Sequence, residues 1–227
     1  MGTIAASTIL DKAQTILQDT SGVRWPDEEL LGWLNDGQRE IVIYKPNASV
    51  KNQAVALVAG TKQTLPADGV QLIDLPRNMG NGSTPGRAIR ITMREVLDAQ
   101  VPNWHALTQS TEIKHYTYTL LDPKTYYVYP PAVAGTQVEM VYTATPANVG
   151  STASAITIDD IYQTVLLDYV LYRAYSKDTE YAPDGNRAAA HQNAYLAAIG
   201  GKARVEAAVN PNASAPANPD VVPNNTR

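Results

Sequence analysis

Apolar residues near the N-terminus recur at the spacing of a buried helix. Within residues 24–46 they fall at i, i+3, i+4, i+7, i+11 and i+14, namely Leu30, Trp33, Leu34, Gly37, Ile41 and Tyr44. This spacing places all six on one stripe of a helix. Pro26 suits the start of such a helix, and Pro46 is suited to end it.

A first helix is expected over residues 3–19, before Ser21-Gly22 interrupts the pattern. Thr3 is a candidate N-cap, because its hydroxyl can accept a free backbone N–H of the first turn. The inner face of this helix is predicted to consist of Ile9, Ala13, Ile16 and Leu17.

The middle of the chain has the alternating period of strands. Strands are predicted over residues 53–58, 70–75, 88–93, 113–121, 125–129 and 137–143, with a short helix over 94–100. Residues 78–86 read as an exposed loop, and Asp122-Pro123-Lys124 as a hairpin turn. In the last strand, Val138, Met140 and Tyr142 share one face.

Helical spacing returns at Asp159. One face is predicted from Ile161, Val165, Tyr169 and Tyr172, widened by Leu167, Leu171 and Ala174. A turn at residues 183–185 leads to an alanine-rich last helix, which is expected to weaken at Gly200-Gly201 because glycine disfavours helix.

Together these elements predict an α+β fold with a helical bundle built from the two ends of the chain. Residues 1–50 and 155–207 form the bundle, residues 51–154 a β-rich insertion, and residues 208–227 an extended C-terminal tail. The bundle core is expected to contain Trp25, Leu30, Trp33, Leu34, Ile41, Tyr169 and Tyr172.

Composition narrows the classes of function. The 227 residues include no cysteine, so disulfides and thiol chemistry are excluded. No apolar run approaches the roughly 18 residues that span a bilayer, and no secretory signal is recognisable, so we expect no membrane association and synthesis in the cytoplasm.

The net charge of −4 argues against a dedicated nucleic-acid binder. The densest basic segment, residues 77–94, has four arginines, and it reads either as a DNA-facing loop or, more often for such segments, as solvated surface.

No residues stand out as catalytic, metal-binding or cofactor-binding. The acidic residues 27–29 and 159–160 lie where helices start, and there they complement the helix dipole. His105, His115 and His191 share no spacing typical of a zinc site. Thirteen tyrosines, several on the predicted strands, suit either core packing or a protein interface.

Seven segments resemble, in order, a family of tailed-bacteriophage head-to-tail adaptor proteins. They are RWPDEELLGWLNDGQREIVIYKP (24–46), GTKQTLP (60–66), LIDLPRNMG (72–80), PGRAIR (85–90), LDAQVPNWHA (97–106), DPKTYYVYPP (122–131) and DYVLYRAYSKDTEYA (168–182). The resemblance covers most of residues 24–200. It departs from the family where tyrosine replaces an expected phenylalanine, as at Tyr126.

This resemblance implies a structural virion protein at the portal vertex: a ring of twelve copies that joins the portal to a tail or nozzle protein and lets DNA pass without specific binding. The C-terminal tail of the chain, residues 208–227, is then the predicted portal-binding segment, through Val209, Asn210, Pro211, Pro216, Pro219, Val221, Val222 and Pro223. Arg77, Arg87 and Arg90 are candidates for a loop that faces the lumen or the tail. The alternatives are another tail component, such as a tail-tube terminator or plug, a DNA-end-binding packaging protein, or a tail-borne wall hydrolase.

Overall fold

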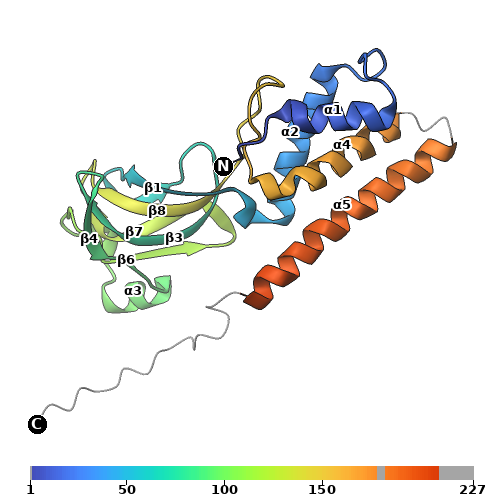
Figure 1. The fold of residues 1–227 in the computed structure, drawn as a ribbon. Coiled ribbons are helices and arrows are strands. Elements are labelled where there is room, and N and C mark those ends of the chain that lie inside the picture. Colours follow the sequence, from blue (N-terminus) through green and yellow to red (C-terminus); the bar gives the residue numbers. More distant parts are fainter. Residues whose placement is uncertain (1, 178–181, 210–227) are drawn as a thin grey trace, which may run out of the picture. The chain divides into compact units, whose positions relative to one another are not determined.

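The computed structural model describes residues 2–177 and 182–209, and its fold is α+β (Figure 1). The chain divides into two compact units. The β unit comprises Met1–Gly2, Gln38–Asn148 and Thr157–Asp159. The helical unit comprises Thr3–Gly37, Val149–Ile156 and Asp160–Arg227.

The helical unit is built around helix α4 (Gln163–Lys177). Helix α4 contacts α1 (Ala6–Leu17) and α5 (Ala182–Val209), and the unit also holds the first part of α2 (Asp27–Tyr44). The buried residues of α4 are Leu166, Tyr169, Val170, Leu171, Ala174 and Tyr175. Because these residues cover more than half of the helix circumference, α4 buries area against several neighbours at once.

Three faces differ from the sequence prediction. Ile16, Tyr44 and Ile161 were placed on buried stripes but are exposed. Ile161 lies in a 3-10 turn, η3 (Asp160–Tyr162), that precedes α4. A 3-10 turn has three residues per turn rather than 3.6, so the apolar phase shifts and Tyr162 is buried in its place. Ile16 lies at the border of the buried stripe of α1. Tyr44 is the last residue of α2.

Thr3 was predicted as the N-cap of the first helix, but it does not occupy that position. The cap position of α1 is Ala5, without a side-chain hydrogen bond. The backbone N–H of Thr3 donates instead to the Asp160 carboxylate at 2.7 Å, as does the N–H of Ile4 at 3.1 Å. The hydroxyl of Thr3 donates to the same carboxylate. Asp160 therefore ties the N-terminal segment to the start of the α4 region, a role beyond dipole complementation.

The last helix starts earlier and runs further than predicted. Residues 183–185 belong to the first turn of α5 instead of a separate turn, and the helix continues through Gly200-Gly201 to Val209. Each glycine costs about 1 kcal/mol relative to alanine. Packing of Tyr195 and Ile199, both buried, favours the helix just before this pair.

The β unit is a sandwich of two four-stranded sheets. One sheet has the order β1-β8-β3-β4, with β1 at Val50–Ala56, β8 at Gln137–Ala144, β3 at Gly69–Gly80 and β4 at Thr84–Ala88. The other has the order β2-β7-β6-β5, with β2 at Gly60–Thr64, β7 at Asp122–Ala132, β6 at His115–Thr119 and β5 at Arg90–Ile91. Their facing side chains, such as Met140 and Val128, form one core.

Two predicted loops belong largely to strands. In the segment predicted as a loop, residues 78–86, only residues 81–83 form the turn, because Met79 pairs with Pro85 and Gly80 with Thr84. The hairpin turn between β6 and β7 is Leu120-Leu121, whereas Asp122-Pro123-Lys124 opens β7. The pairing of Thr119 with Asp122 fixes this tighter turn.

Short helices complete the β unit. Helix α3 covers Arg94–Gln100, as predicted. Two 3-10 turns, η1 (Pro46–Ser49) and η2 (Trp104–Ala106), lie before β1 and after α3. Trp104 is fully buried, and its indole N–H donates to Asp98 of α3 at 2.9 Å. This bond fixes α3 next to η2, which contacts β7.

Candidate functional site

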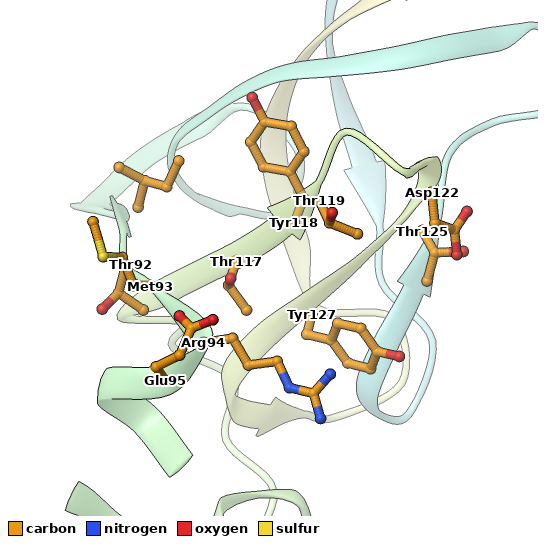
Figure 2. Close-up of a pocket in the computed structure, with 11 residues that line it drawn as sticks. Thr92, Met93, Arg94, Glu95, Thr117, Tyr118, Thr119, Asp122, Thr125 and Tyr127 are labelled. Carbon is orange, nitrogen blue, oxygen red and sulfur yellow. The ribbon is translucent and has the colours of Figure 1, made fainter. Parts of the chain in front are cut away.

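A groove on the β unit is the candidate site for contact with another molecule. It has a volume of about 700 Å³ and lies where β5, the start of α3, β6 and β7 meet (Figure 2). Its lining consists of Ile91, Thr92, Met93, Arg94, Glu95, Thr117, Tyr118, Thr119, Asp122, Thr125 and Tyr127. Met93, Arg94, Tyr118 and Tyr127 in this lining are of the residue types that are enriched at protein interfaces.

The wall of the groove is held from behind by a chain of contacts. Tyr127 meets the rings of Trp104 and His105 edge-on, with centroid distances of 6.2 and 5.8 Å. His105 stacks on Trp104 at 3.7 Å, and its Nδ1 lies 2.8 Å from the Thr61 hydroxyl. Asp98 also pairs with Arg94 at 3.3 Å. These contacts hold Tyr127 and the start of α3, two parts of the groove wall, against η2.

Exposed apolar side chains flank the groove. Leu121, at the tip of the β6–β7 hairpin, is 96% exposed, and its neighbour Leu120 is 70% exposed. Ile91 and Met93, in the groove wall itself, are also exposed. Grouped apolar side chains on a surface commonly mark a protein interface. We call the groove and the two leucines the groove–hairpin surface.

This surface was not predicted from the sequence. The Leu120-Leu121 pair was assigned to the end of a strand, where one of the two would face the core. Two consecutive leucines directly before Asp122-Pro123 were the available signal, since a two-residue turn exposes both side chains.

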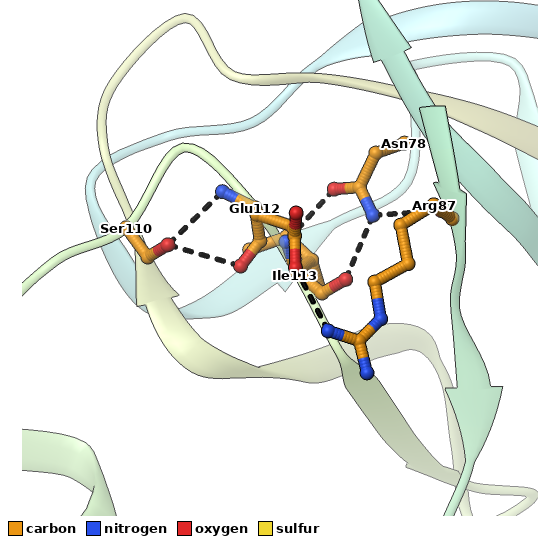
Figure 3. A network of polar contacts seen from close by, with 5 residues as sticks. All are labelled: Asn78, Arg87, Ser110, Glu112 and Ile113. Atoms are coloured by element: carbon orange, nitrogen blue, oxygen red, sulfur yellow. Dashed lines mark hydrogen bonds and ion pairs between the residues drawn. The ribbon is translucent and has the colours of Figure 1, made fainter. Parts of the chain in front are cut away.

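The three arginines predicted for a lumen or tail-facing loop lie on strands. Arg77 of β3 is paired with Glu139 of β8. Arg87 of β4 is paired with Glu112 at 3.0 Å (Figure 3). Arg90 is on β5, opposite His115. Two of the three charges are therefore balanced by carboxylates, which weakens them as phosphate ligands.

A buried amide fixes this region of the β unit (Figure 3). The side chain of Asn78 donates to the backbone oxygens of Arg87 at 2.9 Å and of Ile113 at 2.7 Å. Its oxygen accepts the N–H of Ile113 at 2.8 Å. Asn78 thus holds β4 and the segment before β6 against β3. Gly86 permits the close approach, because a Cβ there would lie 3.0 Å from the Asn78 backbone oxygen.

The three histidines occupy separate places. His105 contacts Thr61, His115 faces Tyr129 at 6.1 Å between ring centroids, and His191 Nδ1 lies 2.9 Å from Asp168. Burial lowers the pKa of His115, and the charges of Arg90 and its neighbours lower it further. Within the described residues no three potential metal ligands gather, and no helix is both long and apolar enough to cross a bilayer.

The predicted bundle residues have different degrees of exposure. Trp25, Leu30, Leu34, Ile41 and Tyr169 are buried, whereas Trp33 and Tyr172 are half-buried. Ile41 belongs to the part of α2 that falls in the β unit. Of the predicted portal-binding residues, Val209 ends α5, and residues 210–223 lie outside the described part of the chain.

A protein-family model described as the SU10 adaptor protein matches residues 4–219. The chain belongs to the SU10 adaptor family. The chain is therefore a bacteriophage adaptor protein, and the family is one of structural proteins. Membership implies a place in the virion and association with portal and tail proteins. No curated protein matches this SU10 adaptor.

Proposed function

We propose that this SU10 adaptor assembles as a ring of twelve copies that joins the portal to the next tail or nozzle protein. The observation that carries the proposal is the family match, which extends over both compact units. A closed ring of identical subunits needs two different, complementary surfaces on each copy. The helical unit, as a bundle formed from both ends of the chain, supplies lateral contacts in this arrangement.

The groove–hairpin surface is proposed to receive the tail-side partner. Its support is the combination of the groove with the exposed side chains of Leu120, Leu121 and Met93. A few buried anchor residues contribute most of the affinity at protein interfaces, and a fixed groove avoids the entropy cost of ordering.

DNA is proposed to pass through the ring without specific contacts. The net charge of −4 and the carboxylate partners of Arg77 and Arg87 support this. A passage that bound phosphates tightly would release counterions and hold the genome, which opposes ejection.

The experiment that tests the adaptor role is the mass of the complex that forms with purified portal rings. Full-length chain and a variant ending at Ala207 are titrated separately against the portal. Saturation near one copy per portal subunit supports the adaptor role. Loss of binding on truncation supports the portal-binding prediction for the tail, and equal binding by both forms assigns the portal contact to the helical unit. Absence of binding by either form refutes the proposal.

A further inference from the structure

Strand β1 presents an unpaired edge. It is the terminal strand of its sheet and pairs only with β8, from Val50 opposite Thr143 to Ala56 opposite Gln137. Every residue of β1 except Val55 is exposed, and within the described residues no strand adds to its other side. Such an edge is a template for another extended segment.

The direction of the free backbone groups follows from the ladder. Just after β1, the N–H of Leu57 donates to Thr136 at 2.8 Å, and its oxygen accepts from Gly135 at 2.9 Å. In an antiparallel pair, every second residue directs its backbone N–H and C=O groups to the partner strand. The backbone N–H and C=O groups of residues 51, 53 and 55 are therefore directed to β8. Val50, Asn52, Ala54 and Ala56 direct their N–H and C=O groups to the open edge.

The side chains of β1 leave this edge accessible. The strand contains no proline, and its one charged residue, Lys51, is engaged with Asp68. That carboxylate also accepts the Tyr142 hydroxyl at 3.2 Å. The residues that point to the open edge are small or uncharged. The charges and prolines that block most sheet edges are thus absent from the accessible side of β1.

One segment of the chain outside the described residues has the matching chemistry. Residues 218–224 have the sequence NPDVVPN, with prolines at 219 and 223. Because these two positions have the same parity, both missing N–H groups fall on the same side of an extended strand. The residues at 218, 220, 222 and 224 keep their donors on the other side. Their number equals that of the outward-pointing residues of β1.

We propose that residues 218–224 of one copy add as an antiparallel fifth strand to β1 of a second copy. The inference rests on the self-assembly in the proposed function and assigns a contact to it. The eight residues between Val209 and this segment can span at most roughly 26–29 Å, which sets the largest distance allowed between the end of α5 in one copy and β1 of the second. The prolines then face outward from the new edge and stop further addition.

Disulfide mapping tests the pairing, because the chain has no cysteine of its own. A chain with Ala54→Cys is mixed with a second chain that carries one cysteine at each position from 218 to 224 in turn. Oxidation is carried out on the chains alone and on portal rings. Antiparallel addition to β1 predicts that cross-linking between chains alternates along the segment, strong at even positions and weak at odd positions, because directly opposed residues of an antiparallel pair carry their side chains on the same face. A yield without period two, or no cross-link in either setting, overturns the proposal.

The double variant separates exchange from folding back. If Ala54→Cys and Val222→Cys cross-link within one chain, while the mixed single variants do not cross-link, the tail covers its own β1 and the proposal is wrong.

Proline variants give a second readout with a matched control. Val222→Pro removes a donor that points to β1, and we expect a loss of roughly tenfold in self-association, the effect of one hydrogen bond. Val221→Pro removes a donor that points away and leaves self-association unchanged. If Val222→Pro weakens portal binding alone, the tail serves the portal and not β1. Failure of every form to bind portal refutes the adaptor role. The cross-link pattern of the chains alone decides the addition to β1 independently of that result.

Discussion

A single methyl group at Gly37 tests how closely α2 and α4 approach. A Cβ at this position would lie 2.8 Å from Cδ1 of Tyr169 and 3.3 Å from Cδ2 of Leu166. Real Cβ contacts are longer than the first distance, so Gly37→Ala requires the tyrosine to move. The ring of Tyr169 is buried and packs against the ring of Tyr195 at 5.2 Å, so it has little room.

Gly32 in the same helix provides the matched control, because a Cβ there meets nothing within 4 Å. Both substitutions gain about 0.8–1 kcal/mol of helix propensity. Overpacking costs about 1–3 kcal/mol and applies to Gly37→Ala alone. The difference between the two variants is therefore about 1–3 kcal/mol, with the propensity gain cancelled. For a chain of this length it corresponds to a difference of about 2–12 °C in Tm.

Thermal unfolding followed by circular dichroism at 222 nm measures this difference. We expect Gly32→Ala to raise Tm, and we expect the Tm of Gly37→Ala to be lower than that of Gly32→Ala. Tyr169→Ala removes the obstacle, so in that background Gly37→Ala is expected to become stabilising. Equal stabilisation by Gly32→Ala and Gly37→Ala in the natural background would refute the close approach.

Three further predictions follow from the polar ties and the surface. Asn78→Leu leaves two buried backbone groups unpaired, so we expect a loss of at least about 2 kcal/mol in urea unfolding, against less than about 1 kcal/mol for Arg87→Ala, whose ion pair is exposed. Hydrogen bonds from the N-terminal segment lower the pKa of Asp160 below 3.8, so its tie is present above that pH and is lost as pH falls through the lowered pKa. The protection factors of the amides in the N-terminal segment (intrinsic over observed exchange rate) should then fall in acid, and Asp160→Asn should remove this pH dependence. Leu120→Asp with Leu121→Asp should change stability by less than about 0.5 kcal/mol and keep portal binding, but yield few infectious particles; unchanged infectivity contradicts the tail-side role.

Elements with one strongly buried face could be predicted from the sequence. Val138, Met140 and Tyr142 were placed on one face of a strand, and all three are fully buried in β8. Burial of one face imposes the period of two that the sequence displays. Helix α3 was predicted with its observed bounds because a proline follows it and its pattern is short and local.

Elements whose geometry depends on pairing partners could not be predicted. Asp122-Pro123 has the composition of a turn, but its place is decided by the register of β6 against β7, where Thr119 faces Asp122. Residues 78–86 look like a loop because their glycines and asparagines are turn formers. The buried bonds of Asn78 to distant backbone groups make this segment a hairpin, and no local pattern encodes them. The groove likewise brings together α3 and strands that are separated in sequence.

The distribution of tryptophans has an optical consequence. The chain has three, of which Trp104 lies in the β unit and Trp25 and Trp33 in the helical unit. Trp104 is fully buried against an imidazole ring, so its emission should be shifted to the blue and sensitive to the loss of that stacking. Replacing Trp25 and Trp33 by tyrosine would leave Trp104 as the one tryptophan, and its emission would then follow the β unit alone during assembly.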